Sequence, residues 1–101
     1  MPLNNPSVSK ISRSTAVNAS TVASTATSSI LLAANTGRVG ASIWNKSTSD
    51  LFVELGDTAT IAAYTVKIGA DGYYEVPFGY VGTISGIWDV ADGSALVREF
   101  V

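Results

Sequence analysis

The sequence predicts an all-β protein: a single small β-sandwich or jelly-roll-like barrel of about seven strands, preceded by an extended, Ser/Thr-rich N-terminal arm. Three observations support this prediction. Residue types that favour strands are common, whereas the strong helix formers Glu, Lys, Gln and Arg are few. Apolar and polar residues alternate with a period of two over several short stretches. Turn-forming residues interrupt these stretches at intervals of about ten residues, a spacing typical of sandwiches and barrels.

The length of 101 residues supports one domain with a single modest core. We assign residues 1–27 to the arm and residues 28–101 to the β-sandwich domain. The chain contains no cysteine, so no disulfide compensates for the small core. Stability must therefore come from packing, from neighbouring copies or from docking on a larger surface.

The N-terminal segment is dominated by hydroxyl side chains, with twelve Ser or Thr among residues 7–29. Few of its side chains can anchor a core, which is typical of a flexible linker. However, Val17, Ala19, Thr21 and Ala23 form a sparse alternation, which an extended arm that becomes ordered on a partner would also show. The sequence leaves both interpretations open.

Seven stretches account for the predicted strands, each bounded by turn-forming residues. They are residues 28–33, 39–44, 51–55, 64–68, 73–76, 81–88 and 95–101. In the second stretch Ile43 is expected to face the core and Trp44 to face away, and in the third Phe52 is expected to face away. Asp71-Gly72 is expected to close a hairpin, because this dipeptide readily adopts the positive φ angles of tight turns. Gly86 is expected at a bulge or a close approach.

Charge is divided unevenly along the chain. Four basic residues precede the first acidic residue, Asp50, and all eight acidic residues lie from that position onward. Such asymmetry is typical of an arm that lies on an acidic surface, although ordinary solvated side chains give the same pattern. Four scattered basic residues are too dilute to follow a phosphate backbone, so no nucleic-acid partner is expected. The longest apolar run, residues 30–34, is too short to cross a bilayer, so no membrane partner is expected.

The residue types argue against catalysis. There is no histidine and no cysteine, which removes the commonest general base, the commonest transition-metal ligand and the thiol nucleophile. Asp57, Asp71 and Asp92 adjoin glycine, where aspartate stabilises turns, and Glu99 is expected at an outward strand position. We therefore expect no enzyme activity, no cofactor and no metal. The glycosylation sequon at Asn45 is attributed to chance.

The aromatic side chains are the better functional candidates. Adjacent residues of a strand point to opposite faces, so some aromatic rings must lie outside the core or be covered by a partner. They could be core residues, anchors of a protein interface, or a platform for stacking sugars. The residues selected as a candidate interface are Lys10, Arg13, Val17, Trp44, Phe52, Tyr73 and Trp88.

Several blocks of residues 28–101 resemble a family of small β-sandwich structural proteins of tailed bacteriophages. The blocks are LLAANTGRVGASIWN, LFVE, YTVKI, GYYEVPF and GIW, in this order. The resemblance implies a β-sandwich protein of the virion, such as a capsid decoration or cement protein, and brings no catalytic motif. A tail or fibre position is also compatible with it.

From these observations we expect a non-enzymatic protein of the capsid surface. It would bind the major capsid protein at capsomer junctions and stabilise the head. It would also bind itself, as a homotrimer rather than a homodimer, because cement proteins sit at symmetric positions of the shell. The alternative is a carbohydrate- or receptor-binding module of a head or tail fibre.

Overall fold

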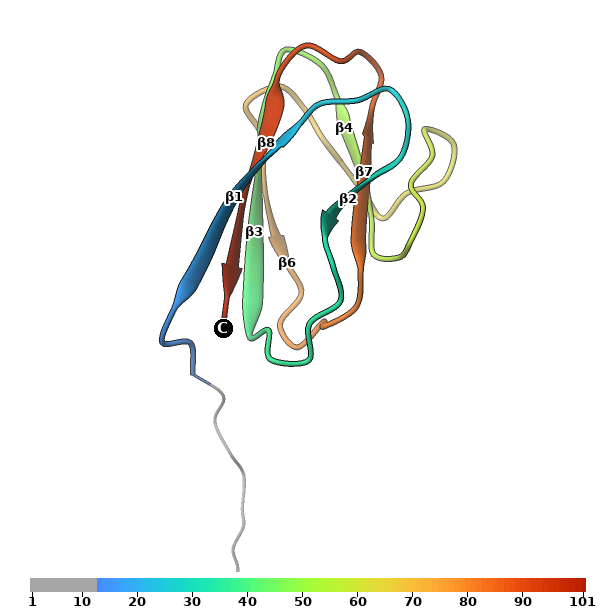
Figure 1. Ribbon diagram of the computed structural model, residues 1–101. Helices are drawn as coiled ribbons and strands as arrows, with labels where there is room; N and C mark the ends of the chain where they lie inside the picture. The colour runs from blue at the N-terminus through green and yellow to red at the C-terminus, as the bar shows by residue number, and fades with distance from the viewer. Residues whose placement is uncertain (1–12) are drawn as a thin grey trace, which may run out of the picture.

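The computed structural model describes residues 13–101, which form eight strands and no helix. The strands make two four-stranded antiparallel sheets that face each other (Figure 1). The first sheet has the order β1 (Val17–Ala23), β8 (Ser94–Phe100), β3 (Gly40–Lys46) and β6 (Tyr73–Val76). The second has the order β2 (Ser29–Leu32), β7 (Ile84–Trp88), β4 (Leu51–Glu54) and β5 (Val66–Ile68). The predicted all-β class and a sandwich-like arrangement are confirmed.

Each of the seven predicted stretches overlaps one strand, and the eighth strand is β1. It lies inside the segment expected to be an arm and pairs with β8 in continuous antiparallel register, from Val17 opposite Phe100 to Ala23 opposite Ser94. The sheet therefore begins at Val17, eleven residues before the expected boundary. The physical reason is that small and β-branched residues suit a strand at the edge of a sheet, where only one neighbour is needed. Residues 1–12 of the expected arm lie outside the described residues.

The core lies between the two sheets and is aliphatic with one tryptophan. Alternate residues of β3 and β8 are buried, as are most of β4 and β7. Trp88 and Ile43 are fully buried at its centre. Gly86 faces this core as a close-approach position, since a Cβ atom there would lie 2.9 Å from Leu31 Cδ1 and 3.0 Å from Leu51 Cδ1.

The predicted Asp71-Gly72 turn is present, but the positive φ angle and the need for glycine fall on different residues. Asp71 takes the positive φ, at 59°. Gly72 is required for space, because a Cβ atom there would lie 2.7 Å from Ile68 Cγ2 and 2.8 Å from the Gly69 carbonyl oxygen.

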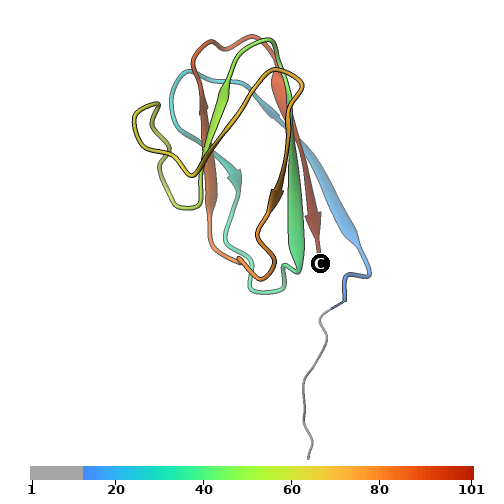
Figure 2. The ribbon, with the colours of Figure 1, turned by 180° about the vertical axis from the view of Figure 1, so that it is seen from behind.

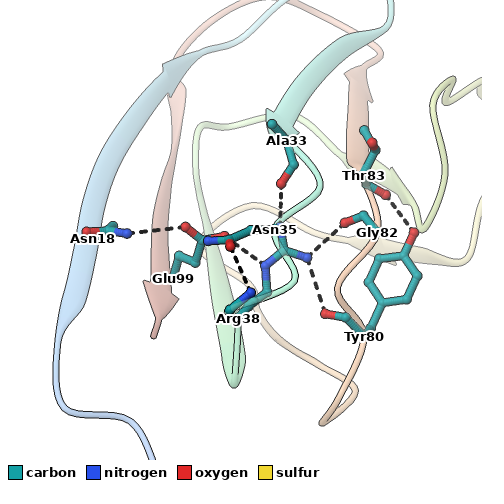
Figure 3. Close-up of polar contacts among 9 residues, drawn as sticks. Asn18, Ala33, Asn35, Arg38, Tyr80, Gly82, Thr83 and Glu99 are labelled. Carbon is teal, nitrogen blue, oxygen red and sulfur yellow. Dashed lines mark hydrogen bonds and ion pairs between the residues drawn. The ribbon is translucent and has the colours of Figure 1, made fainter.

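A buried arginine fastens one end of the sandwich, just before β3 (Figure 3). Arg38 is only 3% exposed, and its Nε donates to Glu99 Oε2 of β8 at 2.8 Å. Its two terminal nitrogens donate to the carbonyl oxygens of Ala33, Tyr80 and Gly82. These carbonyls belong to the β2–β3 and β6–β7 connections, which cross between the sheets. Glu99 was expected to face outward; it is instead 7% exposed, because it is the counter-ion of Arg38.

A buried asparagine fastens the opposite end, near the end of β3. Asn45 is fully buried, and its Nδ2 donates to the carbonyl oxygens of Ser49, Ile68 and Gly69. Its Oδ1 accepts from Trp88 Nε1 at 3.1 Å and from the Ser47 hydroxyl at 2.7 Å. Asn45 therefore joins the two sheets and the connections between them. Its burial also shows that this side chain does not present a glycosylation acceptor at the surface.

Candidate functional site

The side chains of the first sheet that point away from the core form what we call the open face. Strand alternation and register define it, because the intervening residues of β3 and β8 are buried. Its members are Val17, Ala19, Thr21 and Ala23 of β1; Ser94, Leu96, Arg98 and Phe100 of β8; Gly40, Ser42, Trp44 and Lys46 of β3; and Tyr73 and Glu75 of β6.

Cross-strand register arranges the open face in rows. One row reads Thr21, Leu96, Trp44 and Tyr73, and it is mainly apolar. The adjacent row reads Ala19, Arg98, Ser42 and Glu75, and it carries one positive and one negative side chain. The open face thus has a mainly apolar row beside a row in which Arg98 and Glu75 lie on opposite sides of β3.

Large apolar side chains on this face are exposed. Val17 is 51% exposed, Trp44 48% and Tyr73 58%, and Phe78 just after β6 is 75% exposed. These four are half of the eight exposed large hydrophobic residues within 13–101. Trp44 and Tyr73 are adjacent in one row, whereas Val17 lies opposite Phe100 towards the other end of the sheet. Adjacent exposed apolar residues mark interaction surfaces more often than isolated ones do.

The outer face of the second sheet differs, because the protein covers part of it. Residues 55–65, between β4 and β5, project on the side of this sheet away from the first (Figures 1 and 2). Within this loop Ala59 is buried and its N–H donates to the Ser28 hydroxyl at 2.9 Å. The ring of Tyr64 lies 4.9 Å from that of Phe52. This loop thus covers part of the second sheet, whereas no segment within residues 13–101 covers the open face.

A shallow hollow of about 220 Å³ opens on the first sheet. Its lining residues are Gly40, Ala41, Ser42, Tyr73, Glu75, Val76, Phe78 and Phe100. The Tyr73 hydroxyl donates to Glu75 Oε2 at 3.0 Å. This hydrogen bond raises the pKa of Tyr73; desolvation and the negative charge of Glu75 act in the same direction, and a hydrogen bond with Ser42 opposes them. Tyr73 therefore remains neutral at physiological pH and presents a ring beside a carboxylate.

Strand β1 forms an edge of the first sheet, and no strand of residues 13–101 pairs with its outer side. Ala16 and Val101 exchange two backbone hydrogen bonds, of 3.1 and 2.9 Å, at the start of the β1–β8 ladder. By antiparallel alternation, the N–H and C=O groups of Val17, Ala19, Thr21 and Ala23 point away from β8. The strand VNASTVA contains no charged residue and no proline, the usual devices that block strand addition at an edge.

The residues selected from the sequence divide into three groups. Val17, Trp44 and Tyr73 all lie on the open face, and Arg13 is exposed near the start of β1. Phe52 and Trp88 do not belong to an exposed surface. Trp88 is fully buried because its indole packs in the core and donates to Asn45, and Phe52 is 9% exposed because it lies against Tyr64. Lys10 lies outside the described residues.

Sequence reasoning did not select the other large or charged members of the open face, above all Leu96, Arg98 and Glu75. A signal for them existed in the strict alternation of 94–100, whose buried residues are Ala95, Val97 and Glu99. This alternation alone does not identify a site, because a strand residue can be assigned to a shared surface only when the neighbouring strands are known.

Other polar clusters have structural explanations. Asp92 accepts hydrogen bonds from the Thr48 and Ser49 hydroxyls, and these bonds lower the pKa of its carboxyl group. They join two connections at one end of the sandwich.

Residues 13–101 contain no group of three or more side chains suited to holding a metal ion. Over the same residues, no helix is long and apolar enough to cross a membrane.

Comparisons of the chain with protein-family models, with curated proteins and with solved structures returned no match.

Proposed function

We propose that this chain is a non-enzymatic structural protein of a bacteriophage virion, a decoration or cement protein of the capsid surface. It binds the major capsid protein at capsomer junctions and stabilises the head. The observation that carries the proposal is the open face, a sheet surface that no segment of residues 13–101 covers, with Trp44 and Tyr73 exposed side by side and Val17 exposed near one end. An exposed sheet surface with adjacent apolar side chains is suited to binding another protein.

The strand topology supports this proposal. Strands β1, β2, β3 and β4 pair in turn with β8, β7, β6 and β5, as in a long hairpin rolled into two sheets. We infer from this winding that the domain is a jelly roll, an architecture of viral capsid and lectin domains. Because one fold hosts many functions, the topology supports the class of protein and not its partner.

The internal architecture suits a protein that must resist force. Arg38 and Asn45 fasten the two ends of β3 to the connections that cross between the sheets. Such fixed connections keep the interface side chains in place, which lowers the entropy that binding must overcome. The unpaired edge of β1 offers a second adhesive element, to which an extended segment of a capsid subunit can add as a strand.

One observation favours a second candidate function, a carbohydrate- or receptor-binding module of a head or tail fibre. The exposed ring of Tyr73 lies beside the Glu75 carboxylate at the rim of a hollow that also contains Ser42. Aromatic rings with adjacent hydrogen-bonding groups can stack on sugars. The hollow is shallow and the apolar row extends beyond it, so we place this function second.

Binding to capsid shells assembled from the major capsid protein tests the proposal. The wild-type chain is expected to bind saturably at sites that follow the symmetry of the shell. Trp44→Ser is expected to weaken this binding by about tenfold or more, since a half-buried tryptophan at an interface is a typical hot spot. Ile61→Ser is the matched control, because Ile61 is similarly exposed but lies in the loop over the second sheet.

Two results would overturn the proposal. One is an absence of binding to shells by the wild-type chain at micromolar concentration. The other is specific binding to glycans, lost in Trp44→Ser and retained in Ile61→Ser, which would favour the second candidate.

A further inference from the structure

The open face has an approximate internal symmetry about β3. In one row Arg98 of β8 and Glu75 of β6 lie on opposite sides of Ser42. In the next row Leu96 and Tyr73 lie on opposite sides of Trp44. Because neighbouring strands are about 4.8 Å apart, each flanking residue is about 4.8 Å from the β3 axis. Opposite charges thus lie at equal distances on the two sides of one strand.

Neither charge is neutralised within the described chain. The ion pairs of residues 13–101 are Arg38 with Glu99 and Lys67 with Asp50. Arg98 donates only to the Val97 carbonyl oxygen, and Glu75 accepts only from the Tyr73 hydroxyl. Both side chains are therefore available to a partner that presents the opposite charge at the matching position.

We propose that the partner of the open face is a second copy of this chain, related by a two-fold axis that runs along β3. A two-fold rotation about this axis places β8 of one copy over β6 of the other and keeps each row over the same row. Arg98 of each copy then faces Glu75 of the other, Leu96 faces Tyr73, and Trp44 faces Trp44 at the axis. Isologous interfaces of this kind are the commonest way in which proteins form dimers.

The spacing and alignment of packed sheets allow this pairing, and the one like-charge contact that it creates, Lys46 over Lys46, lies at the exposed end of β3. Two sheets that pack face to face are about 10 Å apart with their strands nearly aligned, a gap that long arginine and glutamate side chains can bridge. The tryptophan row lies at the centre of the interface, where aromatic anchors contribute most to binding. Strand β1 lies beyond the edge of the partner's β6, so its unpaired edge remains accessible.

This inference rests on the proposed function, in which the open face is an adhesive surface, and it names the partner that this surface binds. The open face then joins two copies, and the dimer binds the capsid bivalently through its two β1 edges. Trp44→Ser weakens binding to shells because it dissociates the dimer and removes this bivalent attachment. The result is a dimer, the arrangement that the sequence ranks below a trimer.

Sedimentation velocity of the full 101-residue chain, without capsid protein, tests the pairing. The wild-type chain is expected to sediment as a dimer. Arg98→Glu and Glu75→Arg are each expected to weaken the dimer by about tenfold or more, because each places like charges opposite one another. The double variant Arg98→Glu/Glu75→Arg restores opposite charges across the axis and is expected to recover most of the wild-type affinity.

The matched control is Asp57→Arg, which makes the same charge change as Glu75→Arg at an exposed position away from the open face and is expected to remain dimeric. Tryptophan fluorescence gives a second readout, since Trp44 is half exposed in one copy and Trp88 is already buried. A blue shift on dimerisation is expected in the wild-type chain and not in a Trp44→Phe variant that still dimerises.

A monomeric or trimeric wild-type chain, or a charge-swapped double variant no better than the single variants, would overturn the pairing. These results would leave the capsid proposal standing, because binding of the wild-type chain to capsid shells is measured separately. Conversely, a dimer that follows the charge-swap pattern but does not bind shells would support the pairing and contradict the capsid role.

Discussion

Replacement of Asn45 by alanine is expected to lower the free energy of unfolding by about 3–5 kcal/mol, because several buried polar groups lose their partners at once. The Trp88 Nε1–H loses its acceptor, and the carbonyl oxygens of Ser49 and Ile68 lose a donor. The site is fully buried, so water reaches these groups only if the end of the sandwich opens.

Urea denaturation followed by circular dichroism measures this loss. Lys46→Ala is the control, because Lys46 is the exposed neighbour of Asn45 on β3 and a change there is expected to cost less than about 0.5 kcal/mol. A loss below about 1 kcal/mol for Asn45→Ala would show that the asparagine does not hold the two sheets together.

Replacement of Arg38 by methionine is expected to cost about 3–5 kcal/mol at pH 7, since it leaves the carboxylate of Glu99 buried without its counter-ion. Methionine keeps much of the apolar length of the side chain, so most of the loss comes from the charge and the hydrogen bonds. Three carbonyl oxygens, those of Ala33, Tyr80 and Gly82, also lose their donor. Adding Glu99→Gln to Arg38→Met is expected to recover a substantial part of the loss.

The same pair predicts a pH dependence. Burial raises the pKa of Glu99, but hydrogen bonds from Arg38, Asn18 and Asn35 and the charge of Arg38 outweigh burial, and the net pKa is lowered. Glu99 therefore stabilises the wild-type fold above its unfolded pKa of about 4.3, and this contribution is lost as the pH falls through the lower folded pKa.

In Arg38→Met, burial still raises the pKa of Glu99, while the hydrogen bond and the charge of Arg38 no longer lower it. Acidification therefore protonates Glu99 and removes the buried negative charge. The difference in unfolding free energy between wild type and Arg38→Met is thus expected to shrink from pH 7 to pH 4. A difference that stays constant over this range would contradict the role assigned to the Arg38–Glu99 pair.

Local patterns in the sequence were sufficient to locate most strands. The alternation in β3 placed Ile43 inside and Trp44 outside, as the structure shows. Strand β1 was harder, because its serines, threonines and alanines carry little hydrophobic contrast between the two faces. What makes this segment a strand is its pairing with β8, which lies more than seventy residues further along the chain.

The candidate site was only partly predictable for the same reason. Val17, Trp44 and Tyr73 could be selected one by one, but only the β1-β8-β3-β6 order brings them to one face. Trp88 resembles Trp44 in its sequence context, yet it is fully buried and its indole N–H donates to the buried Asn45. Arg38 and Glu99, 61 residues apart, gave no local sign that they form a buried pair.

The copy number of this protein in purified virions tests most directly our proposal that it acts by adhesion as part of a bacteriophage capsid. Mass spectrometry against isotope-labelled reference peptides gives the ratio of this chain to the major capsid protein. We expect a fixed ratio commensurate with the symmetry of the capsomers. Absence from the particle, or only a few copies located at the tail, would contradict the account.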